Sequence, residues 1–495
     1  MKNSIRLLIA LVLWCNVIPA FTQPDTQFDV VLNGGRVIDP ETKLDAIRNI
    51  GIKDGRIVEI SSTPLTGKEN IDVSGLVVSP GFIDLHVHGM TNVEQEYQAY
   101  DGVTSAFELE GGIPFLKEWY ATRKGKAMLN YGASVEWPML RVKASGKYNK
   151  ELDQLKAALA KGESGDGKTW GIIGKYGYES LTDAETAKLL ESISASLDEG
   201  GIGIGIPVGY LPGATREEVF KIYKLAGEKQ VPIISHVREG GAIAVQQAIS
   251  DAVVANAPLH VVHINSVTLS EIDLAIEMIN TAQKRGFDIT TEIYPYTAAS
   301  TSLESALFDE GWQDKFGISY DGLQWVATGE RLTKETFTKY RKEGGTVIIH
   351  MMKPEWIKSG IGSMNTMIAS DGMPYAKLAH PRTAGTFSRV LGKYVREEKV
   401  ISLPTAIEKM TLLPAKRLEG VAPIMRFKGR IQVGTDADIT IFDPNKIIDK
   451  ATFEKGLAFS EGVQFVLVNG VFVLKEGKMV KNVFPGQPVY GKYKK

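Results

Sequence analysis

Short apolar, β-like segments alternate with helical patterns through the middle of the chain. Three such pairs, helix first, are residues 216–229 and 231–235, 242–255 and 259–264, and 333–342 and 346–350. Repeated alternation of helix and strand predicts a parallel sheet covered by helices. The length of the alternating region, residues 81–420, favours closure of that sheet into a barrel. We therefore expect an α/β protein built on a (β/α)8 TIM-like barrel.

Both ends of the chain are β-rich and lack this alternation. Asp54-Gly55 separates two β-like runs near the start, and Asn469-Gly470 does the same near the end. Such dipeptides between β-like runs indicate tight hairpin turns. We expect residues 23–80 and 421–495 to combine into one small β-sandwich domain beside the barrel.

The first 22 residues have the order of a secretory signal peptide. Lys2 and Arg6 precede an apolar run over residues 7–13, and small residues follow around Ala20. This run is too short to span a membrane, and no later apolar run is long enough. We expect removal of residues 1–22 and a mature protein that is periplasmic or secreted, with no membrane span.

Removal of the signal peptide also changes the chemistry that the chain can support. It takes away the only cysteine, Cys15, so the mature chain has neither a disulfide nor a thiolate, and any metal must be held by His, Asp or Glu. Without Lys2 and Arg6, the 57 basic side chains become 55 against 58 acidic ones, a formal charge of −3. This balance does not indicate nucleic acid or an acidic membrane as a partner, and it leaves a homo-oligomer open.

The candidate chemistry begins with histidines at the ends of predicted strands. Residues 81–89 read GFIDLHVHG, and strand alternation makes His86 and His88 project together. His236 and His263 each end another predicted barrel strand. Reactive groups of barrel enzymes lie at these strand ends, so the four imidazoles are expected to converge. Histidines with carboxylates and no sulfur suit Zn²⁺ with an open position for water. The other three histidines are assigned to packing, supporting or loop positions: His260, His350 and His380.

Asp371 is the candidate catalytic carboxylate. It follows the partly apolar run over residues 364–369 and precedes a turn, so its side chain can reach the same rim of the barrel. A bound metal would lower the pKa of water from about 15.7 toward about 7. A neighbouring carboxylate can then accept the proton of that water and return it to the leaving nitrogen. An Asp in such a context also serves as an ordinary turn residue.

A set of ordered motifs extends from about Phe28 to Val480. It comprises residues 81–89, 209–213, 235–239, 292–296, 370–372, 380–382, 385–387, 429–431, 434 and 437–438. This set resembles the D-aminoacylase (N-acyl-D-amino-acid deacylase) branch of the amidohydrolase superfamily. The resemblance implies the barrel, the split β domain and a metal site composed of His86, His88, His236, His263 and Asp371.

One departure from the family concerns a metal ligand. The family commonly supplies a cysteine just after the second barrel strand, whereas residues 102–111 of this chain read GVTSAFELEG. Glu110 is expected to replace the cysteine as a ligand. Because a carboxylate can bridge two ions, the site is expected to hold one or two zinc ions. Glu108 points to the same face by strand alternation and is the rival ligand.

A second departure concerns the substrate. Two residues after His263, where the family has a lysine thought to meet the substrate carboxylate, this chain has Asn265. Arg382 can still clamp a carboxylate with two hydrogen bonds. Tyr210 and Tyr294 are expected either to orient the substrate or the developing oxyanion, or to pack in the core. The predicted substrate-binding set is therefore Tyr210, Tyr294, Arg382 and Asn265.

These expectations combine into a metal-dependent hydrolase of linear amides. The predicted reaction is deacylation of N-acyl-D-amino acids by metal-activated water, with N-acyl-D-glutamate as one candidate, so the partner is a small acylated amine or amino acid. A cyclic amide, imide or dipeptide hydrolase of the same superfamily is the first alternative. Such enzymes usually bridge their metals through a carboxylated lysine; Lys175 could be mistaken for one, but Glu110 already fills the bridging role. The second alternative is a non-catalytic, ligand-binding exported protein.

Overall fold

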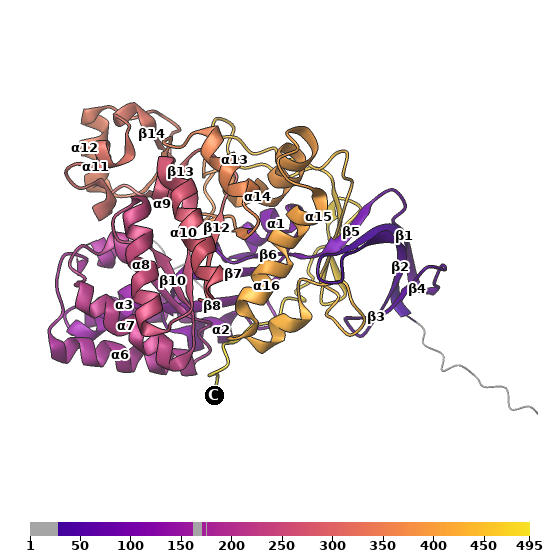
Figure 1. Ribbon diagram of the computed structural model, residues 1–495, viewed down its shortest axis with the longest axis horizontal. Coiled ribbons are helices and arrows are strands. Elements are labelled where there is room, and N and C mark those ends of the chain that lie inside the picture. Colours follow the sequence, from indigo (N-terminus) through magenta and orange to yellow (C-terminus); the bar gives the residue numbers. More distant parts are fainter. Residues whose placement is uncertain (1–27, 162–170, 175) are drawn as a thin grey trace, which may run out of the picture.

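The computed structural model describes residues 28–161, 171–174 and 176–495. It consists of a barrel and a separate sheet that lie side by side along the long axis of the molecule (Figure 1). The predicted signal peptide and Lys175 lie outside the described residues. In the described part of the chain, no helix combines the length and the apolar character that crossing a bilayer requires.

Eight parallel strands form the barrel and follow one another around it in chain order. Most of them are buried along their whole length, because helices cover the outer face of the sheet and side chains fill its interior. The barrel strands are β6 (Phe82–Asp84), β7 (Val103–Ile113), β8 (Asn130–Glu136), β9 (Ile204–Pro207), β10 (Ile233–His236), β11 (Leu259–Val261), β12 (Ile289–Ile293) and β16 (Thr366–Ile368).

The barrel closes between its first and last strands, β6 and β16. The carboxylate of Asp84, at the end of β6, accepts a hydrogen bond of 2.9 Å from the backbone N–H of Ser370. The Ser370 hydroxyl donates to the carbonyl of His86 at 3.2 Å. A parallel bridge joins Val87 to Gly372 just beyond the strands. These contacts complete the ring, and the predicted (β/α)8 barrel is confirmed.

Helices pack around the barrel, and local sequence explains where they begin and which face they bury. Helix α6 starts with a capping box between Thr182 and Glu185. Helix α10 buries Ile272, Ile276 and Ile279 on one face. The helices of this layer are α1 (Asn92–Tyr100), α2 (Leu116–Arg123), α3 (Trp137–Ser145), α4 (Asn149–Ala160), α6 (Asp183–Asp198), α7 (Arg216–Lys229), α8 (Gly241–Ala255), α9 (Ile264–Thr268), α10 (Ile272–Lys284), α13 (Pro354–Gly362), α14 (Arg382–Arg389), α15 (Leu403–Met410) and α16 (Leu412–Glu419).

A small subdomain interrupts the barrel between β12 and β16, and it stands above one edge of the barrel in Figure 1. It has its own aromatic core, in which Trp312 stacks on Phe337 with ring centroids 5.3 Å apart. Its elements are β13 (Ala299–Ser302), β14 (Leu323–Trp325), β15 (Thr346–Ile349), α11 (Trp312–Phe316) and α12 (Lys334–Glu343). We refer to residues 299–349 as the insert.

One predicted barrel strand belongs to this insert. Residues 346–350 were expected in the parallel sheet, and that prediction is wrong. Strand β15 instead pairs antiparallel with β13 and β14, with Ile348 opposite both Ser300 and Gln324. An apolar run of four residues has the same appearance in either sheet. The position of the pairing strands, and not composition, decides which sheet it joins.

Nine strands from both ends of the chain form the second sheet. Strand β5 from the N-terminal part pairs antiparallel with β17 from the C-terminal part, with Val78 opposite Ile441. Asp54 and Gly55 both have positive φ (49° and 76°), as the predicted hairpin turn requires. The predicted β domain built from both termini is therefore confirmed. Its strands are β1 (Phe28–Asp39), β2 (Leu44–Lys53), β3 (Arg56–Ser61), β4 (Gly67–Asp72), β5 (Val77–Pro80), β17 (Ile439–Phe442), β18 (Val463–Val468), β19 (Val471–Lys475) and β20 (Lys478–Met479).

The final residues leave this sheet and pack on the barrel. The backbone N–H of Val489 donates to the carbonyl of Tyr131 in β8 at 2.8 Å, and the Tyr120 hydroxyl donates to the carbonyl of Val489 at 2.9 Å. Val489 is buried in the same apolar core as the barrel strands. The expected domain boundaries at residues 80 and 420 stay predictions, and the tail after β20 contacts the barrel.

A buried lysine in α15 gives a first prediction, on stability. Lys409 is 1% exposed, its ammonium donates to the Ser363 carbonyl, and burial lowers its pKa from 10.5 to about 7. The unfolded chain therefore binds more protons between pH 7 and 10.5, so this lysine makes stability rise with pH across that window. Lys409→Met should raise the free energy of unfolding at pH 7 by about 1 to 4 kcal/mol.

Urea unfolding at pH 7 and pH 9.5 measures this effect. The variant should show the larger gain at pH 7 and a flatter dependence on pH. Lys416→Met, at a side chain with 49% exposure in α16, is the control and should leave the pH dependence unchanged. Equal pH dependence in Lys409→Met and the wild type would contradict the assignment.

Candidate metal centre

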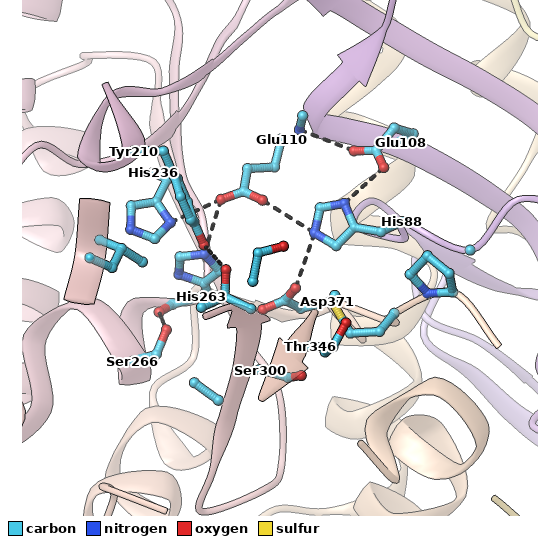
Figure 2. A pocket seen from close by; sticks show the side chains of 18 of the residues that line it. His88, Glu108, Glu110, Tyr210, His236, His263, Ser266, Ser300, Thr346 and Asp371 are labelled. Atoms are coloured by element: carbon cyan, nitrogen blue, oxygen red, sulfur yellow. Dashed lines mark hydrogen bonds and ion pairs between the residues drawn. The ribbon is translucent and has the colours of Figure 1, made fainter. Parts of the chain in front are cut away.

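Six side chains meet at the C-terminal end of the barrel, and Figure 2 labels five of them, all except His86. They lie in or directly after five different strands, which is why residues far apart in sequence come together. Three overlapping sets of them have ligand atoms within 4.8 Å of one another. The six residues are His86 and His88 after β6, Glu110 in β7, His236 at the end of β10, His263 after β11 and Asp371 after β16.

The Glu110 carboxylate lies between all four imidazoles. Its Oε2 is 3.2 Å from His86 Nε2 and 3.3 Å from His88 Nε2. Its Oε1 is 3.0 Å from His236 Nδ1 and 3.3 Å from His263 Nε2. Burial raises the pKa of Glu110, but hydrogen bonds from these imidazoles hold that pKa well below its usual range. Each oxygen of an ionised Glu110 therefore faces a different pair of histidines.

Asp371 lies on the opposite side of the cluster from Glu110 (Figure 2). Its Oδ1 is 3.3 Å from His88 Nε2 and 3.5 Å from His86 Nε2, and its Oδ2 is 2.9 Å from Arg382 Nη1. Burial raises the pKa of Asp371, but the positive charges of Arg382 and His86 outweigh burial and lower it. The carboxylate is thus held ionised, with one oxygen toward the cluster and the other bound by arginine.

Two of these residues have unusual backbone conformations. His263 has a φ of 31° and Asp371 a φ of 53°, in the left-handed region that non-glycine residues seldom adopt. Each costs conformational energy, of order 1 to 3 kcal/mol for sparsely populated regions, and such strain clusters at functional sites. Both residues turn out of a barrel strand at this point, and the turn brings their side chains to the cluster.

The structure separates the two candidate glutamates of β7. Glu110, and not Glu108, lies among the four imidazoles. Glu108 Oε2 is 2.8 Å from the other ring nitrogen of His88, Nδ1, and its Oε1 accepts a hydrogen bond from the Gly111 backbone N–H at 3.0 Å. Glu108 is therefore placed to orient His88 from behind, while Nε2 of His88 faces the cluster.

The donor set fits zinc. It consists of imidazole nitrogens and carboxylate oxygens without sulfur, and zinc binds both kinds of atom with open positions for water in catalytic sites. The two oxygens of Glu110 face separate histidine pairs, so this residue can serve one ion or bridge two. His86, His88, Glu110, His236, His263 and Asp371 would hold the metal.

A second buried cluster lies directly behind the first, and its central residue, Glu292, had no predicted role. Glu292, in β12, lies 2.5 Å from His86 Nδ1 through Oε1 and 3.0 Å from His260 Nε2 through Oε2. Its place near the end of a barrel strand was the signal that could have identified it, since the same signal identified the histidines. His260 occupies the supporting position that was one of its predicted alternatives.

A cavity of about 1270 Å³ opens above the cluster. Its wall includes five of the six cluster residues, residues of the insert, and Tyr210, which follows β9. The Tyr210 hydroxyl is 2.9 Å from Thr301 Oγ1 in the insert. Burial raises the pKa of Tyr210, so the hydroxyl keeps its proton at neutral pH. Tyr210 thus lies where the sequence analysis expected a substrate-binding residue.

The other three predicted substrate residues lie behind the described cavity wall. Arg382 is 1% exposed; besides its contact with Asp371, it donates to the Ser300 carbonyl at 3.2 Å and lies over the ring of Tyr294 at 4.6 Å. Asn265 is fully buried and donates to the Tyr294 carbonyl at 3.4 Å. In this arrangement Arg382 binds the protein's own carboxylate, so its predicted contact with a substrate would require movement.

Comparison with known proteins relates the whole chain to deacylases, although no family model matches the sequence. A D-aminoacylase of Alcaligenes xylosoxydans xylosoxydans is 28% identical over 481 residues, covering 92% of this chain and 96% of that protein. An N-acyl-D-glutamate deacylase of the same organism is 27% identical over 482 residues, covering 91% and 94%. The chain also resembles the solved structure of N-acyl-D-glutamate deacylase from Bordetella bronchiseptica, which is complexed with zinc and a phosphonate mimic of the tetrahedral intermediate. The two superpose with a TM-score of 0.78 at 23% identity, over 94% of this chain and 100% of that chain. The protein is therefore a homologue of D-aminoacylases and N-acyl-D-glutamate deacylases over nearly its whole length.

Proposed function

We propose that this protein is a zinc-dependent hydrolase that removes the acyl group from N-acyl-D-amino acids. The observation that carries the proposal is the cluster of four imidazoles and two carboxylates at the floor of a large cavity. Homology over nearly the whole chain to a D-aminoacylase and an N-acyl-D-glutamate deacylase supports the substrate class.

The chain's own groups supply proton transfer. When bound, zinc lowers the pKa of water and polarises the amide carbonyl. The Oδ1 atom of Asp371 faces the cluster, and Arg382 holds its Oδ2, so Asp371 is oriented to accept a proton from the attacking water. The same carboxyl group can then pass that proton to the leaving nitrogen, which departs as an amine. The products are a carboxylic acid and an amino acid.

Tyr210 is placed to orient the scissile group. It is on the cavity wall, and its ring contacts that of His236 edge to face, with centroids 4.9 Å apart. Because its raised pKa keeps the phenol neutral, Tyr210 can donate a hydrogen bond to an oxygen that gains negative charge. Tyr210 therefore serves as the candidate oxyanion donor from outside the metal-binding set.

The proposal is tested by the release of free amino acid from a panel of N-acetyl D- and L-amino acids. Mature protein is assayed with zinc, with a chelator, and with zinc restored after chelation. Chelator-sensitive release from D-substrates is the expected result. Zinc binding without release from any member of the panel would contradict the deacylase activity, and cyclic amides, imides and dipeptides would be assayed next. Absence of turnover on those compounds as well would favour the non-catalytic alternative.

The cavity wall offers two cationic side chains for a substrate carboxylate among its described residues, Arg123 and Lys315. The Arg123 guanidinium lies over the rings of Trp119 and Tyr131, at 5.5 and 5.1 Å. Lys315, in α11 of the insert, is exposed and forms no ion pair with any other described residue. Burial lowers the pKa of His236, and the positive charge of Lys315 contributes to that lowering. We assign Lys315 to recognition of the substrate carboxylate, in place of the family's lysine that Asn265 replaces.

Lys315→Met is expected to raise the KM for N-acyl-D-amino acids about tenfold, because one charge-assisted contact is lost. The kcat should change less than about twofold. Steady-state kinetics on one acyl-D-amino acid and on its uncharged amide separate recognition of charge from catalysis. The amide should show little difference between variant and wild type. Lys334→Met, at an exposed lysine of the insert outside the cavity wall, is the control. An unchanged KM in Lys315→Met would contradict the assignment.

The location of the protein is part of the proposal. The order of basic, apolar and small residues at the N-terminus supports export to the periplasm or the medium with removal of residues 1–22. N-terminal sequencing of the protein recovered from cell fractions tests both the compartment and the cleavage point. A homo-oligomer stays open and is tested by size-exclusion chromatography with light scattering.

A further inference from the structure

A line of hydrogen bonds extends from the metal cluster down the interior of the barrel. Nδ1 of His86 is 2.5 Å from Oε1 of Glu292, and Oε2 of Glu292 is 3.0 Å from Nε2 of His260. Nδ1 of His260 is 2.8 Å from the hydroxyl of Thr290. His86, Glu292 and His260 are each at most 1% exposed, and Thr290 is half-buried. The line therefore connects a metal-binding imidazole to a hydroxyl at the start of β12.

The register of two neighbouring strands produces this line. His260 in β11 is paired directly with Thr290 in β12. Glu292 lies two residues after Thr290 and so points to the same, interior face of the sheet. Thr291, between them, points to the other face, and its hydroxyl donates to the Val261 carbonyl at 2.8 Å. Thr290 and Thr291 therefore carry hydroxyls on opposite faces of one strand, and only the Thr290 hydroxyl belongs to the line of hydrogen bonds.

The contacts of Glu292 determine which ring nitrogens of His86 and His260 carry hydrogens. A carboxylate only accepts, so His86 Nδ1 and His260 Nε2 both carry hydrogens and donate to Glu292. A neutral His260 then has a lone pair on Nδ1, 2.8 Å from the Thr290 hydroxyl, and this acceptor is closer to the hydroxyl than the Leu259 carbonyl at 3.4 Å. His86 Nε2 faces Glu110 and Asp371, and because Nδ1 keeps its hydrogen, Nε2 is the nitrogen that would offer its lone pair when a metal ion is bound. This is the tautomer in which Nε2 can bind a metal ion.

Neither Glu292 nor His260 touches the substrate space. Both lie outside the described wall of the cavity, behind His86. The other metal-facing imidazole of the same motif, His88, has a different support, the carboxylate of Glu108 at 2.8 Å. The two histidines of the His-x-His pair thus have separate carboxylates on their Nδ1 atoms, and the one behind His86 is extended by a second imidazole and a hydroxyl.

We propose that Glu292, His260 and Thr290 are positioning residues that set the tautomer and ring orientation of His86 and so present its Nε2 to zinc. The inference rests on the proposed function only in requiring zinc at the cluster. It makes no use of the acyl substrate. Loss of the Glu292 carboxylate would leave two buried imidazole donors unpaired and release His86 to turn. Loss of the Thr290 hydroxyl would act on His86 only through His260 and Glu292.

Zinc affinity, measured by competition with a chromogenic chelator, tests the proposal together with the visible absorption spectrum of the cobalt-substituted protein. Glu292→Leu is expected to weaken zinc binding about 10- to 100-fold, the range typical of residues that support a ligand, and to alter the cobalt spectrum. In Glu292→Gln, the amide oxygen can accept a hydrogen bond from His86, and the amide NH2 can donate one to Nε2 of His260 in its other tautomer. This variant should therefore recover much of the lost zinc affinity. Thr290→Val should weaken binding several-fold, whereas the matched control Thr291→Val should not.

The outcomes separate this inference from the proposed function. Wild-type zinc affinity and an unchanged cobalt spectrum in Glu292→Leu would overturn the positioning role, as would equal effects of Thr290→Val and Thr291→Val. If Glu292→Leu does not fold, as judged by circular dichroism, the comparison of Thr290→Val with Thr291→Val tests the positioning role. Zinc binding by the wild type without deacylation would overturn the proposed function alone. Failure of the wild type to bind zinc would overturn both.

Discussion

Asp371→Asn is expected to lower kcat by at least about a hundredfold while the fold and the zinc content are kept. The amide is nearly the same size as the carboxylate but cannot accept a proton from water. Its single oxygen can still face the cluster, while the amide NH2 replaces the oxygen that forms the ion pair with Arg382. The loss should therefore appear in kcat and in kcat/KM together, because proton transfer belongs to the transition state and not to substrate binding.

The measurement compares steady-state rates with zinc content after the variant has been saturated with zinc. Saturation matters because Asp371 Oδ1 also lies 3.3 Å from His88 Nε2, so a weaker metal site could imitate lost proton transfer. Asp45→Asn is the matched control: Asp45 forms an ion pair with Arg36 at 2.7 Å, but it lies in the terminal sheet. A zinc-loaded Asp371→Asn variant that retains more than about a tenth of the wild-type kcat would exclude Asp371 as the main proton acceptor.

The convergence of the histidines could be anticipated because it depends on a rule of the fold. Residues that end parallel strands of a barrel meet at one face, whatever their separation in sequence. His236 ends β10, and His263 and Asp371 turn out of β11 and β16 with positive φ, so the strand-end signal sufficed for all three. Their role as metal ligands is a prediction that zinc measurements test.

The rest of the site depends on pairings that one sequence does not contain. The choice between Glu108 and Glu110 depends on how β7 passes the cluster, since both point to one face by alternation. The line from His86 to Thr290 depends on the register of β11 against β12. Arg382 was expected to bind a substrate carboxylate, but the nearest carboxylate in three dimensions is Asp371. The insert was missed because β15 resembles a barrel strand until its antiparallel partners are known.

Glu110→Ala is expected to weaken zinc binding by more than about a hundredfold, beyond the 10- to 100-fold range of supporting residues. Glu110 is the only described residue of the cluster that lies within 3.3 Å of all four imidazoles, and its removal leaves Asp371, which is close to His86 and His88, as the remaining carboxylate of the cluster. Activity should fall in parallel and should not recover at millimolar zinc. Zinc competition and metal analysis of the purified variant measure the effect.

Glu108→Ala and Glu271→Ala complete this comparison. The Glu108 carboxylate contacts only Nδ1 of His88 in the cluster, so its loss should weaken zinc binding by no more than a supporting residue does. Glu271 lines the cavity but accepts its hydrogen bond from the backbone of Ala242, so its loss should leave zinc binding unchanged. Equal losses in Glu108→Ala and Glu110→Ala would show that the rival glutamate is also a ligand.

Glu110→Cys compares a thiolate with the native carboxylate as a zinc ligand at this position. A thiolate is a good zinc ligand, so this variant should regain tight binding of one ion that Glu110→Ala has lost. Its single sulfur cannot offer separate oxygens to the two histidine pairs, which lie 3.0 to 3.3 Å from different oxygens of Glu110. We therefore expect any second zinc of the wild type to bind more weakly in Glu110→Cys. Retention of both ions with unchanged affinity would mean that the spacing of the histidines, and not the carboxylate of Glu110, determines how many zinc ions the site holds.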